Sequence, residues 1–311
     1  MIRTKGLTKC FNGFTAVKDL NLNVRKGEIY GFLGPNGAGK TTTILMLLGI
    51  LRPTKGEVYL FEKSLYEDYF NIKRRIGVVS EKQYLYEEMT AWEYLDFFSD
   101  FYQVKNSKKR IEELLEWAGL YGVKDKKLKQ FSRGMQQKVG IARALLHNPE
   151  ILILDEPISG LDPMGIKEVR DMIEEQKQLG KTIFISSHLL SEVEKICDRV
   201  GIVNKGVLLA EDKMENLKMR LSREMEIEIE LKKITSEIIK ALSSLDFVNK
   251  VTQEKNLLVV RVKTDKDHRD EIVSTVSSHK GVILGLKMRE MSLEEAFVTI
   301  THRNVSLLAG G

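Results

Sequence analysis

The sequence contains little cysteine. Its 311 residues include only Cys10 and Cys197, which lie far apart in the chain. Two isolated cysteines are too few for a disulfide framework or a cysteine-based zinc site. Reduced thiols are typical of cytoplasmic proteins, so we expect a soluble protein of the cytoplasm.

Long apolar runs are also missing. A membrane-spanning helix needs about 20 consecutive apolar residues, and the longest apolar run, Ile44–Leu51, is far shorter. The N-terminus lacks the basic and then apolar pattern of a signal peptide. We therefore expect any role at a membrane to depend on a separate partner.

Neither sign of charge dominates. Lys and Arg number 49 against 44 Asp and Glu, which gives a net charge of +5. So small an excess permits weak attraction to anionic lipid or nucleic acid but does not argue for either. We expect no nucleic-acid partner.

One stretch carries a strong chemical signal. Residues 34–42 read GPNGAGKTT and fit the phosphate-loop pattern G-x-x-x-x-G-K-[ST]. Glycines let backbone N–H groups approach phosphates closely, a lysine supplies a cation, and the following hydroxyl can ligate Mg²⁺. The segment Glu28–Leu33 before the loop is typical of a strand, and Ile44–Leu48 after it fits a helix. The predicted nucleotide-binding residues are Gly34, Pro35, Asn36, Gly37, Ala38, Gly39, Lys40, Thr41 and Thr42.

Two acidic residues follow the apolar run Ile151–Leu154, which suits a strand buried on both faces of a parallel sheet. Asp155 ends that strand, where open parallel sheets place ligand groups, and can hold Mg²⁺ opposite Thr41. Glu156 could orient or deprotonate an attacking water, so the pair of acids indicates hydrolysis. His188 follows the next predicted strand and could stabilise charge on the transferred phosphoryl, although a lone histidine there is more often structural.

The remaining pattern up to about residue 220 predicts an α/β domain with a helical subdomain, residues 84–148, inserted into it. An aromatic stripe in that subdomain (Met89, Trp92, Leu95, Phe98, Tyr102) has near-helical spacing and indicates core and partner surface. Further strands are expected at Leu20–Val24, Gly56–Phe61, Ile76–Ser80, Lys181–Ser186, Val200–Val203 and Val207–Ala210. Helices are expected at Ser107–Gly119, Ser132–His147, Pro163–Leu179 and Leu189–Cys197.

The segment Phe131–Gln137 reads FSRGMQQ and leads into a predicted helix shortly before the acids. With it, the chain resembles the ATP-binding subunits of ATP-binding-cassette (ABC) transporters, which carry an L-S-G-G-Q signature at this place. The resemblance implies that the signature caps the ATP bound by the other subunit of a head-to-tail dimer. The Ser132 hydroxyl, the Gly134 N–H and the helix N-terminus suit a γ-phosphate. Phe131, Arg133 and Met135 depart from the family's pattern.

The same resemblance assigns further residues between positions 2 and 220. Ser159–Asp162 resembles the loop that couples the two ATP sites, so Asp162 joins the nucleotide contacts. His188 falls on the family's switch histidine. Phe11 falls on the aromatic residue that stacks on adenine, with Val17 beside it. Without that resemblance, Phe11 would be interpreted as a core residue of a hairpin.

Glu81 occupies the place of a family glutamine that contacts Mg²⁺ and the transmembrane subunit. The resemblance therefore implies a permease contact near Glu81–Trp92 and a peripheral location on the inner face of the cell membrane. It also implies a dimer, either of two copies or with a homologous ATPase subunit, and ATP with Mg²⁺ as cofactors.

The pattern restarts after about residue 220, in keeping with a chain too long for one core. The predicted order is β-α-β-β-α-β, typical of a ferredoxin-like α/β sandwich, followed by a capped helix at Ser292–Ile300. Within it, Ser292–Phe297 resembles the ending of accessory domains on exporter ATPases. We expect domains at 1–220 and 221–311, and a role for the second in dimer stabilisation or regulation, with ligand sensing as the alternative. Its expected strands and helices are Met225–Leu231, Ser236–Leu245, Val248–Gln253, Leu257–Val262, Lys266–His279 and Val282–Met288.

These features together predict a P-loop ABC ATPase that powers export of a substrate through a separate permease by ATP-driven dimerisation. An alternative is a soluble ABC ATPase that acts on ribosomes or nucleic acid, although the chain has no tandem cassette. A P-loop kinase or GTPase is a third possibility, but no Asn-Lys-x-Asp motif is present.

Overall fold

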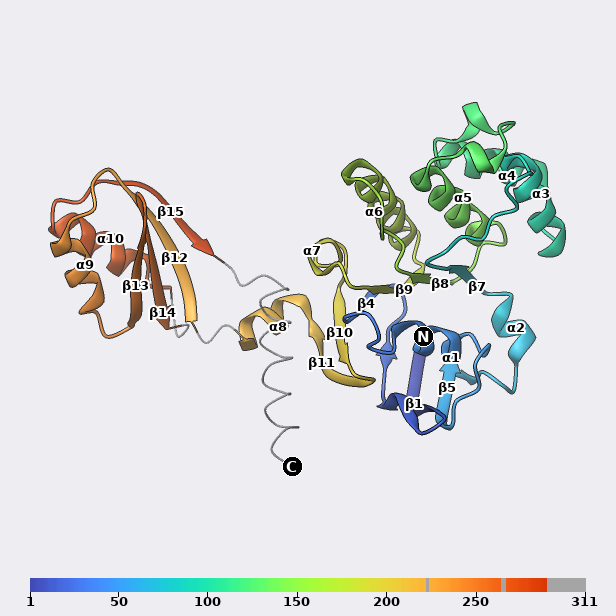
Figure 1. The fold of residues 1–311 in the computed structure, drawn as a ribbon, viewed down its shortest axis with the longest axis horizontal. Coiled ribbons are helices and arrows are strands. Elements are labelled where there is room, and N and C mark those ends of the chain that lie inside the picture. Colours follow the sequence, from blue (N-terminus) through green and yellow to red (C-terminus); the bar gives the residue numbers. More distant parts are fainter. Residues whose placement is uncertain (222–223, 264–266, 290–311) are drawn as a thin grey trace. The chain divides into compact units, whose positions relative to one another are not determined.

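The structure is a computed structural model that describes residues 1–221, 224–263 and 267–289. The chain divides into two compact units, Met1–Met214 and a second that begins at Glu215. Figure 1 shows the helices and strands of both units.

A six-stranded sheet forms the centre of the first unit, in the order β11-β10-β4-β9-β8-β7. All neighbours are parallel except β10 and β11, which form an antiparallel hairpin. Every residue of β4, β8 and β9 is buried, as expected for a parallel sheet covered on both faces. The strands are β4 (Ile29–Leu33), β7 (Ile76–Val79), β8 (Ile151–Asp155), β9 (Thr182–Ser187), β10 (Arg199–Asn204) and β11 (Val207–Lys213).

A second sheet of the first unit is antiparallel and comprises β1 (Ile2–Phe11), β2 (Phe14–Leu20), β3 (Asn23–Val24), β5 (Lys55–Leu60) and β6 (Lys63–Ser64). The prediction of one continuous strand at Leu20–Val24 is wrong, because β2 ends at Leu20 and β3 begins only at Asn23. Asp19 has a φ of 48°, and the N–H of Leu22 donates to the side-chain oxygen of Thr4 at 2.8 Å. A side chain thus takes the place of a ladder partner at the break.

The first unit also contains α1 (Lys40–Leu47), α2 (Tyr69–Lys73), α6 (Pro163–Gln178) and α7 (Leu190–Val193), and α8 (Met214–Leu221) begins at its last residue. The helix predicted at Leu189–Cys197 is much shorter than expected. After Val193 the helix is replaced by a turn, and the N–H of Asp198 donates to the carbonyl of Ile29 at 3.0 Å. That bond directs the chain into β10 beside β4. Among the described residues, no helix has the length and apolar character needed to cross a membrane.

The helical part of the first unit contains α3 (Ala91–Phe101), α4 (Ser107–Trp117), α5 (Arg133–Leu145) and two short 3₁₀ helices, Tyr121–Val123 and Leu128–Gln130. Thr90 and Glu93 start α3 with a reciprocal capping box, a strong helix-start arrangement. Leu95 is fully buried as the stripe predicts, but Tyr94 is the largest buried aromatic of this helix and was not predicted.

The second unit contains β12 (Glu224–Leu231), α9 (Ser236–Ser243), β13 (Val248–Glu254), β14 (Leu257–Lys263), α10 (Arg269–Ser278) and β15 (Ile283–Arg289). Its sheet is antiparallel in the order β13-β14-β12-β15, which fits the predicted ferredoxin-like sandwich. Alternate residues Ile227, Ile229 and Leu231 enter a core separate from that of the first unit. The helix predicted at Ser292–Ile300 lies outside the described residues.

The contact between β7 and α5 joins the helical part to the central sheet and requires glycine. A Cβ added at Gly77 would lie 2.4 Å from the carbonyl oxygen of Ala144 in α5 and 2.7 Å from Leu152. We expect Gly77→Ala to lower the free energy of unfolding by about 1–3 kcal/mol, because backbone must move to relieve the overlap. Gly122→Ala is the matched control, since a Cβ there meets nothing within 4 Å. Urea denaturation compares them, and equal stability of both variants would contradict the packing argument.

Candidate functional site

The loop Gly34–Thr42 joins β4 to α1 at the edge of the sheet where β4, β8 and β9 end (Figure 1). Two of its glycines are needed for space. A Cβ at Gly34 would lie 2.3 Å from the carbonyl oxygen of Val203, and one at Gly39 would lie 2.6 Å from that of Ala16. Gly39 also has a φ of 99°, a conformation that glycine adopts readily.

Lys40 begins α1 and is buried, with 7% of its side chain exposed. Its Nζ donates to the carbonyl oxygens of Gly34 at 2.7 Å and Pro35 at 3.3 Å. The same nitrogen lies 3.1 Å from Oε1 of Glu156, whose side chain is equally buried. The loop therefore holds a cation next to the acid that follows β8.

Asp155, at the end of β8, accepts a hydrogen bond from the Thr41 hydroxyl at 3.1 Å and another from the Ser186 hydroxyl. Burial raises the pKa of Asp155 above its usual range, and the charges of Glu156 and Glu81 raise it further, while the two hydroxyl bonds oppose this. A cation placed here would favour the ionised carboxylate.

Glu156 has a φ of 49°, an uncommon backbone conformation for a residue with a side chain. Its N–H donates to the Ser186 hydroxyl at 3.1 Å. Its Oε2 lies 2.8 Å from Nδ1 of His188 and accepts from the His188 N–H at 3.3 Å. Glu156 is therefore held between Lys40 on one side and His188 on the other.

A cavity of about 650 Å³ opens over these groups. Phe11 lies at its wall with 43% of its surface exposed, so it is available to a ligand rather than buried in the hairpin. The cavity is also lined by three residues that were not predicted as ligand contacts, Phe14, Ala16 and Ser159. Their closeness in sequence to the predicted residues Phe11 and Asp162 could have identified them. The predicted residues that line it are Phe11, Asn36, Gly37, Gly39, Lys40, Thr41, Thr42, Glu81, Glu156 and His188.

Other predicted site residues do not line this cavity. Ser132 caps α5 and Asp162 caps α6, each accepting a backbone N–H three residues ahead. Gly134 lies in the first turn of α5. Val17 is 1% exposed and packs under the loop, where its Cγ2 would touch a Cβ on Gly39. Gly34, Pro35, Ala38 and Asp155 belong to the loop or bond to it without lining the cavity.

Arg133 is the one charged residue of the signature segment Phe131–Gln137. Its guanidinium lies against Gly160, since a Cβ added there would be 2.5 Å from Arg133 Cζ and Nη1. Gly160 has a φ of 69° and belongs to the loop that ends at Asp162. Arg133 therefore links the signature to that loop within one chain.

The geometry brings together a phosphate-binding loop, a buried lysine, a metal-suited carboxylate and an acid that can activate water. This set of groups is suited to nucleoside triphosphate hydrolysis. Among the described residues, no group of three or more His, Cys, Asp and Glu side chains could hold a metal by itself.

Comparison with known proteins gives a consistent result. A family model described as ABC transporter matches residues 17–159. The bacitracin transport ATP-binding protein BcrA of Bacillus licheniformis is 47% identical over 230 residues, which cover 74% of this chain and 75% of that protein. The linearmycin resistance ATP-binding protein LnrL of Bacillus subtilis (strain 168) is 32% identical over 311 residues, covering 98% of this chain and 99% of that protein.

Solved structures agree with the fold of the first unit. A structure described as the ATP-binding subunit of an ABC transporter has a TM-score of 0.65 and 30% identity, over 71% of this chain and 92% of that one. A dimeric ATP-binding cassette in a post-hydrolysis state, bound to ADP and Pi, has a TM-score of 0.63 and 29% identity, over 69% and 99%. The chain therefore belongs to the ABC transporter family, as an ATP-binding subunit.

Proposed function

We propose that this ATPase powers the export of an antibiotic through a separate transmembrane permease. The observation that carries the proposal is the position of Glu156 between Lys40 and His188 at the phosphate loop, because this arrangement suits hydrolysis and not only binding. The bacitracin transport and linearmycin resistance relatives support an antibiotic as the substrate class.

ATP would enter the cavity with its phosphates on the loop and its adenine against Phe11. The exposure of Phe11, 43% of its surface, supports this pose, and Lys9 Nζ lies 5.1 Å from the centroid of its ring. Lys40 would exchange part of its contact with Glu156 for the outer phosphates. The charge of Lys40 is thus kept in place before the nucleotide arrives.

Thr41 and Asp155 would hold Mg²⁺ with the phosphates, and Glu81 at the cavity wall is the third candidate. Hydroxyl and carboxylate oxygens are ligands that Mg²⁺ prefers, and the Thr41–Asp155 bond of 3.1 Å brings two of them together. When bound, the ion neutralises charge on the phosphate oxygens. Its binding would offset the burial and acidic neighbours that raise the pKa of Asp155.

Glu156 would accept the proton of the attacking water, and His188 would orient Glu156 and face the γ-phosphate. The hydrogen bond of 2.8 Å to Nδ1 of His188 supports this pairing. Backbone strain at a residue is often retained at functional sites at a cost of about 1–3 kcal/mol, and the positive φ of Glu156 fits that reading.

We further propose a head-to-tail dimer in which Ser132 and Gly134 of one copy cap the ATP on the other, with Asp162 near the shared interface. Ser132 is exposed at the start of α5 and lies outside the cavity of its own chain. Because Arg133 contacts Gly160, a movement of Ser132 and Gly134 on ATP binding would also move the loop at Gly160. A homologous ATPase subunit could take the place of the second copy.

The permease would dock on the aromatic surface that extends from Glu81–Trp92 into α3. Tyr86 and Phe97 are 52% and 47% exposed and their ring centroids lie 5.7 Å apart, and contiguous exposed apolar side chains mark interaction sites. For the predicted C-terminal domain, residues 221–311, we propose dimer stabilisation or regulation, with ligand sensing as the alternative. Its separate core makes removal of these residues feasible, and dimerisation and ATPase activity of the shortened chain, 1–220, would separate the two roles.

Replacing the proposed base tests the hydrolytic assignment. We expect Glu156→Gln to lower the ATPase turnover by about 100- to 10,000-fold, the range of a general base, while ATP binding and ATP-dependent dimerisation persist. Glu116→Gln, an exposed residue of α4, is the control and should hydrolyse at the wild-type rate. Turnover and sedimentation with ATP give both readouts. Wild-type turnover in Glu156→Gln would exclude the assignment.

Replacing the proposed adenine contact tests the pose of ATP. We expect Phe11→Ala to raise the Kd for ATP about tenfold, because base stacking on an aromatic ring contributes about 1–3 kcal/mol, and Phe11→Trp to restore it. Phe70→Ala removes a ring that is 78% exposed and lies outside the cavity, so it should leave the Kd unchanged. Calorimetric titration with ATP decides; an unchanged Kd in Phe11→Ala would contradict the pose.

A further inference from the structure

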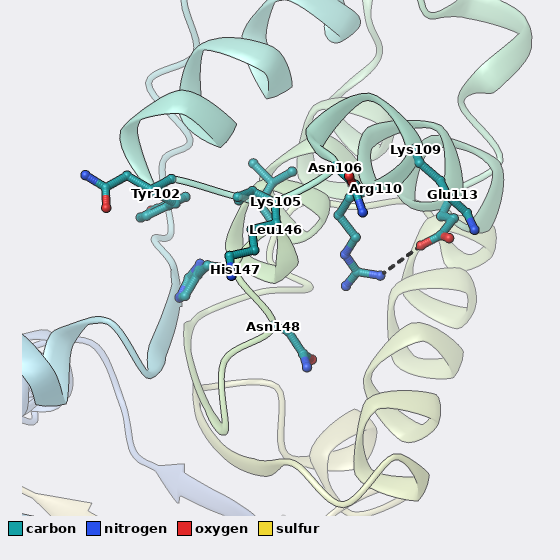
Figure 2. Close-up of a pocket in the computed structure, with 11 residues that line it drawn as sticks. Tyr102, Lys105, Asn106, Lys109, Arg110, Glu113, Leu146, His147 and Asn148 are labelled. Carbon is teal, nitrogen blue, oxygen red and sulfur yellow. Dashed lines mark ion pairs between the residues drawn. The ribbon is translucent and has the colours of Figure 1, made fainter.

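A second cavity, of about 590 Å³, lies on the helical part of the first unit and shares no lining residue with the cavity at the phosphate loop. Figure 2 shows that its side chains come from the end of α3, from the start of α4 and from the chain after α5. Basic side chains outnumber acidic ones in its lining. Lys105, Lys109 and Arg110 are basic, and Glu113 is the one acidic residue that lines it.

Arg110 is only partly neutralised. Its nearest carboxylate oxygen among the described residues is on Glu113, at 3.5 Å from Nη1, as the dashed line in Figure 2 marks. Its Nη2 donates to the carbonyl of Leu145 at 3.0 Å. A guanidinium has five N–H donors, so this one keeps donors for a further acceptor in the cavity.

An adjoining cavity of about 420 Å³ shares Arg110, Glu113 and Asn148 with the first and adds Lys181. Lys181 is 7% exposed. Its Nζ donates to Asn148 Oδ1 at 2.7 Å and to the Pro149 carbonyl at 2.8 Å, but within the described ranges no carboxylate forms an ion pair with it. Burial and then the charge of Arg110 lower its pKa, while the charge of Glu150 opposes this. A buried cation without a counter-ion is costly.

A third group in the cavity also lacks a partner. His147 directs Nε2 to the carbonyl of Ile76 at 3.1 Å, so Nε2 carries the proton and Nδ1 is an acceptor. Nδ1 is buried and has no hydrogen-bond partner among the described residues. Because this nitrogen is closed to solvent, a ligand in the cavity contacts the ring of His147 and not its Nδ1.

We propose that these two cavities form one binding site for a phosphate group. Arg110 and Lys181 hold the phosphate oxygens, and the exposed Lys105 and Lys109 attract the anion. Arginine forks match phosphate geometry, and two close cations favour an anion of more than one charge. Arg110 lies on α4 and Lys181 directly before β9, so a bound phosphate ties the helical part to the central sheet. This site is additional to the proposed export function.

Calorimetric titration of the full chain with inorganic pyrophosphate tests the site. A non-hydrolysable ATP analogue at saturating concentration first fills the phosphate loop, so that pyrophosphate reports only the second site. We expect one pyrophosphate per chain, with a Kd raised about tenfold or more in Arg110→Gln and in Lys181→Met, the range for charged hydrogen bonds. Lys108→Gln, on the same helix but lining neither cavity, is the control and should bind as the wild type does.

A second arm separates free phosphate from a lipid headgroup. Flotation with phosphatidic acid vesicles, whose headgroup is a phosphomonoester, against phosphatidylcholine vesicles, should recover the wild-type chain and lose Arg110→Gln if the phosphate belongs to a lipid. If either variant unfolds, the exposed double variant Lys105→Gln/Lys109→Gln replaces it and should still weaken binding. Absence of both pyrophosphate and vesicle binding, or wild-type affinity in all these variants, would overturn the proposal.

Discussion

The contact between Lys40 and Glu156 is the interaction on which the rest of the site depends. Two buried charges stabilise a protein only when their geometry is good and their remaining bonds are satisfied. The carbonyls of Gly34 and Pro35 satisfy Lys40, and His188 satisfies Glu156. Lys40, Glu156 and His188 follow three different strands, β4, β8 and β9, so the contact exists only because parallel strands bring their carboxyl ends to one edge.

Asp155 and Glu156 are neighbours in sequence, yet both act at the same edge. Successive side chains of a strand point to opposite faces, so a continuing strand would separate the two carboxylates. The φ of 49° at Glu156 ends β8 and turns the second carboxylate towards Lys40, while the first bonds Thr41. The two acids can therefore serve different partners, one suited to a metal and the other to a water.

The parts of the site that local sequence determines could be predicted. Residues 34–42, with the strand before and the helix after, need only adjacent residues, and the acids after Ile151–Leu154 follow from a short apolar run. Contacts between distant residues could not be predicted in this way. The end of β2 at Leu20 depends on the Thr4 side chain. Arg110 and Lys181 line the same cavity, although no sequence motif relates them.

We propose that two copies complete each ATP site, and a mixture of two inactive variants distinguishes this arrangement from a site complete within one chain. Lys40→Ala disables the phosphate loop of its own chain, and Ser132→Arg blocks the cap that its chain offers to the other. Each variant alone should be inactive, whereas a mixture should regain ATPase activity, because the mixed dimer contains one intact loop under one intact cap. If mixed dimers form and the activity of the mixture stays at that of the separate variants, the account is contradicted.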